Sequence, residues 1–495
     1  MSQVIILLFV FVAQTSFANF KSAQRDFVGK KYKKAAAKFF QIMNYPKSTQ
    51  EKLKSEWGLA QSLQKLGFYY SASKYYSVIV RRGASQRNAY FRKAFEELGE
   101  INSIINLGEA HIVQLLKTKV NPARIPGVAR GFYFHYQGVN SFRNGNYKLA
   151  QSAFQKVPSS SPYHVKSLFF LGILANMEKL YGRAISYFMK VKSSSDSEWL
   201  QEVATLNIAR VHYEARRYRQ ALRYYAEIPR ESDNWLQALF EGSWAFFLMK
   251  KYNHTLGNIH TFTSPFFHNR FYPEIYVLQA ITFLNLCRYD EVKSSINKFK
   301  DRYTPAFKDL RKLINRYRSD HAKFFRLIKK YREGSLKGYR NAHVVVDSLS
   351  RRDIYKEALM TVRFSTRELE RLENASQLWL RSGLIDDLKS FLVKKRSVSM
   401  SSAGAKLLEG ARESVEYLTE LYNQTRFIKA ELLLGRVDKL RSLLKVSTAE
   451  KKANFIGGMR EIARKSELEF WPFEGEYWED ELGGYVYDIV SSCKK

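Results

Sequence analysis

One tyrosine returns through the middle of the chain at a nearly constant interval, and this periodicity constrains the fold more than any other feature. Tyr147, Tyr181, Tyr218, Tyr252 and Tyr289 follow one another at intervals of 34, 37, 34 and 37 residues. Intervals of this length are typical of stacked helical hairpins, in which each repeat packs on its neighbours. The sequence therefore predicts a helical solenoid, a fold that offers surface for binding.

Each tyrosine is accompanied by side chains at helical spacing. In the first of these repeats a small residue, Ala150, follows three positions after the tyrosine, and the large residues Phe154 and Val157 follow seven and ten positions after it. Offsets of three and four place these side chains on one helix face. A small residue nine positions before the tyrosine, such as Gly138 or Gly172, marks an earlier helix. Each repeat is therefore predicted to be helix, short turn, helix.

This pattern resembles the tetratricopeptide repeat (TPR), although the early tryptophan of that family is missing from its usual place in these five repeats. Tyr32 and Tyr69 begin two further repeats upstream, and residues 87–120 leave room for one degenerate repeat. About seven or eight repeats would then cover residues 20–305. The resemblance implies an all-α, TPR-like solenoid of helical hairpins, with a concave groove lined by the first helix of each repeat.

The composition changes at both ends of the predicted solenoid. Residues 1–18 carry no charged side chain and contain an apolar core from Val4 to Val12, which resembles a signal peptide cleaved after Ala18. We therefore expect an exported protein, periplasmic after cleavage, with an uncleaved anchor or a cytosolic protein as alternatives. The solenoid is assigned to 19–305, a basic helical region to 306–465 and an acidic, aromatic tail to 466–495.

The basic region is predicted to form long helices that cap the solenoid as a bundle or hairpin. No proline occurs between 306 and 471, and apolar residues recur at helical spacing in 351–380 and in 402–445. The Ser/Lys/Arg-rich segment 394–402 is the expected loop between these two helices. A cap of this kind would cover the apolar face that the last repeat leaves open.

The net charge of +34 predicts attraction to anionic partners. A candidate anion-binding patch lies in the basic region and comprises Arg311, Lys312, Arg316, Arg318, Lys329 and Lys330. Apolar residues at helical spacing lie beneath it, which suits either a helix on an anionic membrane surface or, our preferred interpretation, a helix that packs on a neighbour. Nucleic acid would match the positive charge of the chain, but the expected export of the protein argues against nucleic acid as a partner.

The resemblance places a candidate partner-binding groove on the first helices of the repeats. Its lining is Phe132, His135, Phe142, Phe169, Asn176, Arg210, Tyr213, Phe240, Trp244, Phe247 and Ile281. TPR proteins that hold a peptide carboxylate use Lys, Arg and Asn here, but Arg210 and Asn176 are nearly alone in this chain. An apolar lining suits a helix or an extended apolar peptide. The alternatives are that the chain's own tail fills the groove or that tight winding buries it.

The sequence lacks the motifs of catalytic and metal sites. It contains no G-x-S-x-G, no glycine-rich phosphate loop and no H-E-x-x-H, and its histidines are poorly spaced for metal binding. No cofactor is therefore expected. Cys287 and Cys493 are the only cysteines, and a disulfide between them is an alternative in an oxidising compartment.

Three functions remain open from the sequence. The preferred one is a non-enzymatic, exported scaffold at the bacterial cell envelope that holds a protein or peptide in its groove. The second is a charge-driven module for an anionic glycan or lipid surface. The third is a divergent cell-wall glycan-cleaving enzyme that uses the acids of the tail, such as Glu476 and Glu479. Lytic transglycosylases can also carry a basic helical superhelix, but their catalytic Glu with its Gly-Leu-Met-Gln-like segment is absent.

Overall fold

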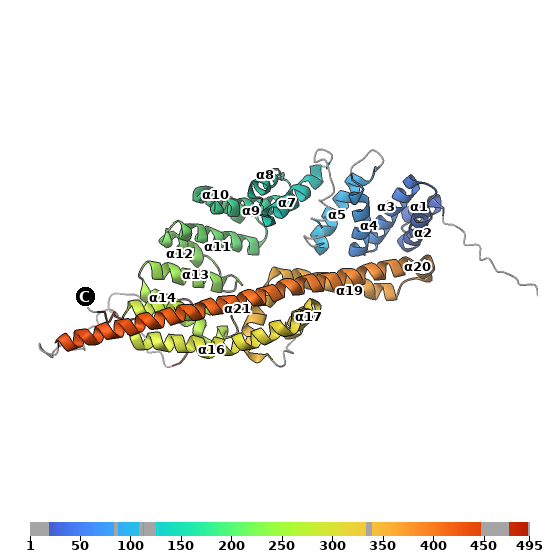
Figure 1. Ribbon diagram of the computed structural model, residues 1–495. Helices are drawn as coiled ribbons and strands as arrows, with labels where there is room; N and C mark the ends of the chain where they lie inside the picture. Colours follow the sequence, from blue (N-terminus) through green and yellow to red (C-terminus); the bar gives the residue numbers. More distant parts are fainter. Residues whose placement is uncertain are drawn as a thin grey trace, which may run out of the picture. The chain divides into compact units, whose positions relative to one another are not determined.

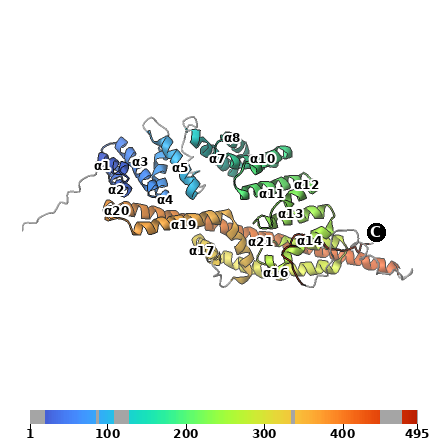
Figure 2. The same cartoon turned by 180° about the vertical axis from the view of Figure 1, so that it is seen from behind.

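The computed structural model describes residues 19–83, 88–107, 112, 125, 127–332, 339–446 and 475–493. Within these ranges every regular element is a helix (Figures 1 and 2). The chain divides into two compact units, of which unit 1 comprises residues 1–167 and 357–400 and unit 2 comprises 168–356 and 401–495. The fold is thus all-α, as predicted.

Unit 1 contains the first hairpins of the chain and a later helical segment. Its described helices are α1 (Phe20–Val28), α2 (Tyr32–Asn44), α3 (Thr49–Lys65), α4 (Tyr69–Arg81), α5 (Phe91–Ile105), α7 (Gly127–Arg143), α8 (Tyr147–Gln155) and α20 (Gln377–Ser382). Most of α19 (Asp353–Glu373) and the first part of α21 (Leu384–Val446) also belong to it. Consecutive helices from α1 to α5 pack on one another, and α7 packs on α8.

Unit 2 continues the series of hairpins and adds further helices. It contains α10 (Tyr181–Ser194), α11 (Glu198–Glu214), α12 (Tyr218–Ala226), α13 (Trp235–Leu248), α14 (Tyr252–Thr263), α15 (Glu274–Asn285), α16 (Tyr289–Tyr317), α17 (His321–Arg332) and α18 (His343–Arg351), with 3-10 helices at Pro265–Phe267 and Arg340–Ala342. Most of α9 (His164–Met177) and the remainder of α21 belong to it. Each helix from α10 to α16 packs on the next.

Every periodic tyrosine begins the second helix of a hairpin. Tyr32, Tyr69 and the five tyrosines from Tyr147 to Tyr289 are the first residues of α2, α4, α8, α10, α12, α14 and α16. The predicted repeat boundaries are therefore confirmed for seven hairpins. Of the degenerate repeat expected near 87–120, the structure describes α5, and the residues expected to form its second helix lie almost entirely outside the described ranges.

The turn of each hairpin repeats one backbone geometry. The residue two positions before the tyrosine has a positive φ between 54° and 74° in all seven hairpins: Lys30, Gly67, Gly145, Lys179, Arg216, Lys250 and Cys287. The N–H of the next residue donates to the carbonyl oxygen five residues earlier, at 2.8–2.9 Å. This is the Schellman motif, which ends one helix and aims the chain into the next.

The small residue of each repeat lets the two helices of a hairpin approach closely. A Cβ at Gly138 would lie 2.6 Å from the ring of Phe154, and a Cβ at Gly172 would lie 2.7 Å from the ring of Phe188. Both phenylalanines are buried. The predicted pairing of a small residue with a large apolar one therefore forms the hairpin core.

Several periodic tyrosines pack edge-on against an aromatic ring across the turn. The ring centroids of Phe142 and Tyr147 are 5.6 Å apart, those of Tyr213 and Tyr218 are 5.5 Å apart, and Phe27 makes the same contact with Tyr32 at 5.4 Å. Edge-to-face aromatic pairs add stability beyond their burial. This contact gives a physical reason for an aromatic ring at these positions.

One assigned boundary falls within a helix, and one expected loop does not occur. The assigned boundary between 305 and 306 lies inside α16, which includes Pro305 and continues because Tyr303, Ala306 and Leu310 keep one buried face. The loop predicted at 394–402 is also wrong, because α21 runs through it. Serines lower helix propensity only modestly, and the burial of Leu392 and Ala403 on either side outweighs that cost.

Candidate functional site

The first helices of unit 2 carry a row of half-buried apolar side chains. Phe169 on α9, Tyr213 on α11, Phe240, Trp244 and Phe247 on α13, and Ile281 on α15 are all partly accessible to solvent. We call these six residues the first-helix face. The opposite sides of the same helices form the hairpin cores, where Ala209, Ser243 and Ala280 are fully buried.

Aromatic contacts hold the rings of the first-helix face in fixed positions. The ring centroids of Trp244 and Phe247 lie 5.7 Å apart in a T-shaped pair, and Phe247 lies 5.7 Å from Tyr252. Phe240 packs on Tyr272 at 5.8 Å, and Phe169 packs on Phe188 at 5.5 Å. A surface of held rings loses little side-chain entropy when a partner binds.

The only arginine predicted for the groove is already paired within the protein. Nε of Arg210 lies 3.0 and 2.9 Å from the two carboxylate oxygens of Glu241, and Nη2 lies 2.6 Å from Oε1. Burial alone would lower the pKa of Arg210, but hydrogen bonds and charge from Glu241 raise it above its usual value. Glu241 also accepts from Tyr225 at 3.0 Å and from Gln237 at 2.7 Å. Arg210 is therefore committed to holding α11 against α13.

Asn176 is likewise engaged within the protein. Its Nδ2 donates to Oε2 of Glu214 at 3.0 Å, which joins the end of α9 to the end of α11. With Arg210 and Asn176 both paired, the first-helix face presents rings rather than a clamp for a carboxylate.

Two residues predicted to line the groove lie in the core of unit 1. Phe132 is 3% exposed and His135 is 5% exposed. Phe132 packs against Phe95, Tyr136 and Tyr163, whose ring centroids lie 5.2–5.6 Å away. Contact of these two residues with a partner is therefore incompatible with the structure, because tight packing of aromatic rings covers them. Phe142, also in unit 1, is partly accessible.

Burial also fixes the chemistry of His135. Ser167 donates its hydroxyl proton to the carbonyl oxygen of Tyr163 at 2.8 Å, so its oxygen accepts from Nδ1–H of His135 at 2.9 Å. Burial, with the charge of Lys166 adding to it, lowers the pKa of His135 to about 3. This histidine is a neutral member of the core and not a ligand for a partner.

The residues of the predicted anion-binding patch are exposed. Arg311, Lys312, Arg316 and Arg318 lie on α16 and at its end, and Lys329 and Lys330 lie on α17. The apolar faces of the same helices are buried, including Leu310, Leu313, Phe324, Phe325 and Ile328. These helices therefore pack on their neighbours through their apolar faces, as the preferred interpretation stated, and the cations lie on their exposed sides.

The described part of the acidic, aromatic tail, residues 475–493, packs on unit 2. The N–H of Tyr487 donates to the carbonyl oxygen of Asn253 at 3.1 Å, and the N–H of Gly483 donates to Oγ1 of Thr261 at 2.8 Å. A Cβ at Gly257 would lie 1.7 Å from the carbonyl oxygen of Tyr485. These contacts place the tail on α14, a second helix of a hairpin.

Rings of the tail surround His260 on α14. The ring of Tyr477 stacks on His260 at 4.8 Å between centroids, and Tyr485 approaches it edge-on at 5.0 Å. Burial lowers the pKa of His260, as does the charge of Lys298, while Glu476 raises it. The tyrosines in the described part of the tail thus pack on a docking site on the protein itself.

Cys287 and Cys493 form a disulfide across 206 residues of sequence. Cys287 occupies the positive-φ position of the turn between α15 and α16. The N–H of Ser492 donates to the carbonyl oxygen of Leu286 at 2.8 Å, beside the bridge. The pairing that the sequence left as an alternative is therefore present, and it ties the tail to the end of α15.

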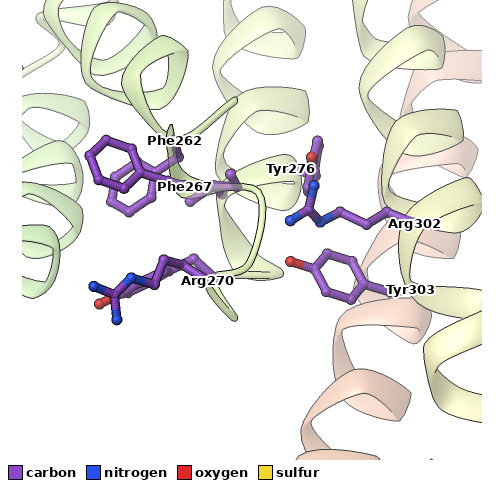
Figure 3. Close-up of a pocket in the computed structure, with 8 residues that line it drawn as sticks. Phe262, Phe267, Arg270, Tyr276, Arg302 and Tyr303 are labelled. Carbon is purple, nitrogen blue, oxygen red and sulfur yellow. The ribbon is translucent and has the colours of Figure 1, made fainter. Parts of the chain in front are cut away.

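One small pocket in unit 2 was missed by the sequence analysis (Figure 3). Its volume is about 200 Å³ when the open space at its mouth is included. It is lined by Phe262, Phe267, Arg270, Tyr272, Ile275, Tyr276, Arg302 and Tyr303. Figure 3 shows the guanidinium of Arg302 between the side chains of Tyr276 and Tyr303. No periodic pattern links these residues, because two of them come from the loop before α15. The lining contains no carboxylate, cysteine or histidine.

The described residues contain no cluster of three or more His, Cys, Asp or Glu side chains arranged to hold a metal ion. None of the helices in the same ranges combines the length and apolarity of a membrane-spanning segment. The apolar segment Val4–Val12, predicted to belong to a signal peptide, lies outside the described residues.

Comparison with known proteins adds similarity to solved structures. No protein-family model matches the chain, and a search of curated proteins gives no match either. Among solved structures, the chain is similar to the crystal structure of the apo form of RapI, with 13% sequence identity and a TM-score of 0.35. The similarity covers 68% of this chain and 97% of RapI. Because that TM-score is low, the fold rests on the helices and the packing described above.

Proposed function

We propose that this protein is a non-enzymatic scaffold that holds a protein or peptide partner on the first-helix face of unit 2. The observation that carries the proposal is the row of partly accessible rings on α9, α11 and α13, where the guanidinium of Arg210 and Nδ2 of Asn176 already have partners within the protein. An apolar surface with few polar donors left to satisfy gains most by burying apolar side chains of a partner. An amphipathic helix or an extended apolar peptide suits it.

Trp244 and Phe247 are the proposed centre of the binding surface. They form a T-shaped pair on α13, and both remain half-buried in the free protein. Trp and other large aromatic residues dominate the binding energy of interfaces when they lie centrally. The part of such a residue that is still exposed is the part that a partner would cover.

We further propose that the protein is exported to an oxidising compartment, the periplasm, where it works at the cell envelope. The Cys287–Cys493 bridge supports this, because disulfides persist in oxidising compartments and are rare in the cytosol. The uncharged, apolar N-terminal segment supports it independently. Mass determination of the protein recovered from cells tests cleavage, since removal of residues 1–18 would leave a chain that starts at Asn19.

Capture of the partner from native cell extracts tests the scaffold proposal. The variant Trp244→Ala/Phe247→Ala should lose captured protein while its helical circular dichroism is unchanged. A matched control replaces two exposed aromatic residues of unit 2 that are not on the first helices of the hairpins, Phe266→Ala/Phe427→Ala, and should capture as the wild type does. Equal capture by all three proteins would overturn the proposal.

The second candidate is a charge-driven module, which is favoured by the exposed cations on α16 and α17. Attraction between exposed charges weakens as salt screens it, whereas burial of apolar rings does not. Release of the protein from envelope fractions by modest salt, with capture through Trp244 and Phe247 absent, would favour this candidate over the scaffold.

A further inference from the structure

Basic residues occupy the left-handed position of three successive hairpin turns in unit 2. Lys179, Arg216 and Lys250 have φ angles of 58°, 57° and 60°. A second basic residue follows in two of these turns, at Arg217 and Lys251. Glycine is the residue that this backbone favours, and it stands there in two turns of unit 1. The backbone of the turn therefore favours glycine, although a cation at the C-terminal end of a helix interacts favourably with the helix dipole.

These turns lie side by side along one edge of the hairpin stack. The hydrogen bond from Asn176 to Glu214 joins the helix ends that precede the first and second turns. The ion pair of Arg210 with Glu241 joins α11 to α13, the helices that precede the second and the third turn. Figure 1 shows the hairpins following one another from α9 to α14. The cations therefore recur once per hairpin along this edge.

The five cations of this row are available to a ligand. All of them are exposed. Among the described residues, no carboxylate lies within ion-pair distance of any of the five. Two acids stand in the same turns, Glu178 and Glu214, and Glu214 is occupied by Asn176. The second and third turns, which contain four of the five cations, therefore carry a clear positive charge.

Partly exposed tyrosine rings stand directly beside the cations. Tyr181, Tyr218 and Tyr252 begin the helices that follow the three turns, and each is partly accessible. Tyr218 is held edge-on by Tyr213 at 5.5 Å, and Tyr252 is held by Phe247 at 5.7 Å. We call the five cations and these three tyrosines the turn edge. It repeats a positive charge and a ring once per hairpin.

We propose that the turn edge binds a linear anionic polysaccharide. A row of charges at regular spacing matches a chain with repeated acidic groups better than it matches a single headgroup. Tyrosine offers an apolar ring on which the C–H face of a sugar can pack, and a hydroxyl that can bond its polar groups. Single-stranded nucleic acid is also bound by cations with aromatic rings. The choice of a glycan over a nucleic acid rests on the proposed export to an oxidising compartment, which the disulfide to Cys493 supports.

Binding of polygalacturonate to the full chain, measured by titration calorimetry at low and at physiological salt, tests the proposal. The variant Lys179→Gly/Arg216→Gly/Lys250→Gly removes three charges and suits the backbone of the turns, so it should fold and bind at least about tenfold more weakly. The matched control Arg311→Gln/Arg316→Gln/Arg318→Gln removes three exposed charges from the α16 patch and should bind within about twofold of the wild type.

Further ligands distinguish the chemistry of the partner. Tyr218→Leu/Tyr252→Leu should weaken binding of polygalacturonate and leave binding of linear polyphosphate, which has no sugar ring, unchanged. The proposal is overturned by wild-type affinity in the triple glycine variant, or by an equal loss in the control. It is also overturned if polyphosphate, single-stranded DNA or phosphatidylglycerol vesicles bind the turn edge more tightly than polygalacturonate does.

Discussion

At the scale of single residues, the hairpin turns show a conflict between backbone and side chain. A positive φ costs an L-residue with a Cβ about 1–2 kcal/mol, whereas glycine adopts it without that cost. The hydrogen bonds of the turn hold a lysine or arginine in this unfavourable conformation in four hairpins, at Lys30, Lys179, Arg216 and Lys250. A residue that is unfavourable for the fold at a repeated position points to a role in binding.

Replacement of one such residue by glycine should not destabilise the protein. Lys250→Gly removes the strain of φ 60° and adds chain entropy to the unfolded state, for a net gain of about 0.5 kcal/mol. Lys190→Gly, within α10, should instead lose about 1 kcal/mol. Urea unfolding of the two variants measures the difference. Equal losses in both would show that the turn is not strained.

His135 should make the stability of the protein depend on pH. Its pKa is lowered to about 3 in the folded protein by burial, whereas in the unfolded chain it is about 6.5. Below pH 6.5 the unfolded state binds a proton that the folded state does not, so stability falls by about 1.4 kcal/mol per pH unit. When the pH falls from 7.5 to 5.5, the free energy of unfolding measured in urea should decrease by about 1.4 kcal/mol less in His135→Gln than in the wild type. An identical loss would contradict a neutral, buried His135.

At the scale of elements, a buried carboxylate joins α19 to the N-terminal hairpins of unit 1. Glu368 accepts hydrogen bonds from the backbone N–H groups of Tyr70 at 2.7 Å and Ser71 at 3.1 Å, at the start of α4. Burial raises the pKa of Glu368 and lowers that of Lys395 to about 8. Nζ of Lys395 lies 4.7 Å above the ring of Tyr70. A segment nearly 300 residues later in the chain thus caps a helix of an early repeat.

Removal of this carboxylate should destabilise the protein strongly. Glu368→Ala leaves two buried N–H groups without an acceptor and Lys395 without a nearby anion, at a cost of about 3 kcal/mol. Glu370→Ala, an exposed neighbour on α19, should change the free energy of unfolding by less than about 0.5 kcal/mol. If the two variants unfold at the same urea concentration, the buried capping contact contributes nothing.

The elements that the sequence predicted well are those that local chemistry determines. A turn and the first residue of the next helix depend on neighbours within a few positions, so the periodic tyrosines locate seven helix starts. The capping of α4 by Glu368 depends on a contact between residues far apart in the sequence, and no local sequence pattern predicts it. The continuity of α21 through its serine-rich segment depends in the same way on tertiary packing.

The residues of the candidate site likewise divide into those that hairpin geometry placed correctly and those whose positions depend on tertiary packing. The half-buried ring pair Trp244 and Phe247 lies at predicted groove positions, because hairpin geometry fixes which side of α13 is in the core. The burial of Phe132 and His135 was not predictable, since it arises from packing particular to unit 1. The pairing of Arg210 with Glu241 needs two helices in register, which periodicity alone does not specify.

At the scale of the whole molecule, the disulfide closes a long loop. In the chain-entropy account, a bridge across 206 residues stabilises the folded protein by up to about 5 kcal/mol. Reductant should therefore lower the midpoint of thermal unfolding of the wild type and leave that of Cys493→Ser unchanged. It should also raise the fluorescence of an apolar dye, because release of the tail uncovers α14. A midpoint insensitive to reductant would show that the bridge does not hold the tail.

A photo-crosslinking residue at position 244, compared with one at position 427, tests the central claim that the first-helix face holds a protein partner. Both positions carry an aromatic residue in unit 2, but Trp244 lies on that face whereas Phe427 is exposed on α21. Illumination of cells that produce each variant, followed by mass spectrometry, should give a discrete protein adduct from position 244 and none from 427. Adducts at 427 alone, or none at 244, would contradict the account.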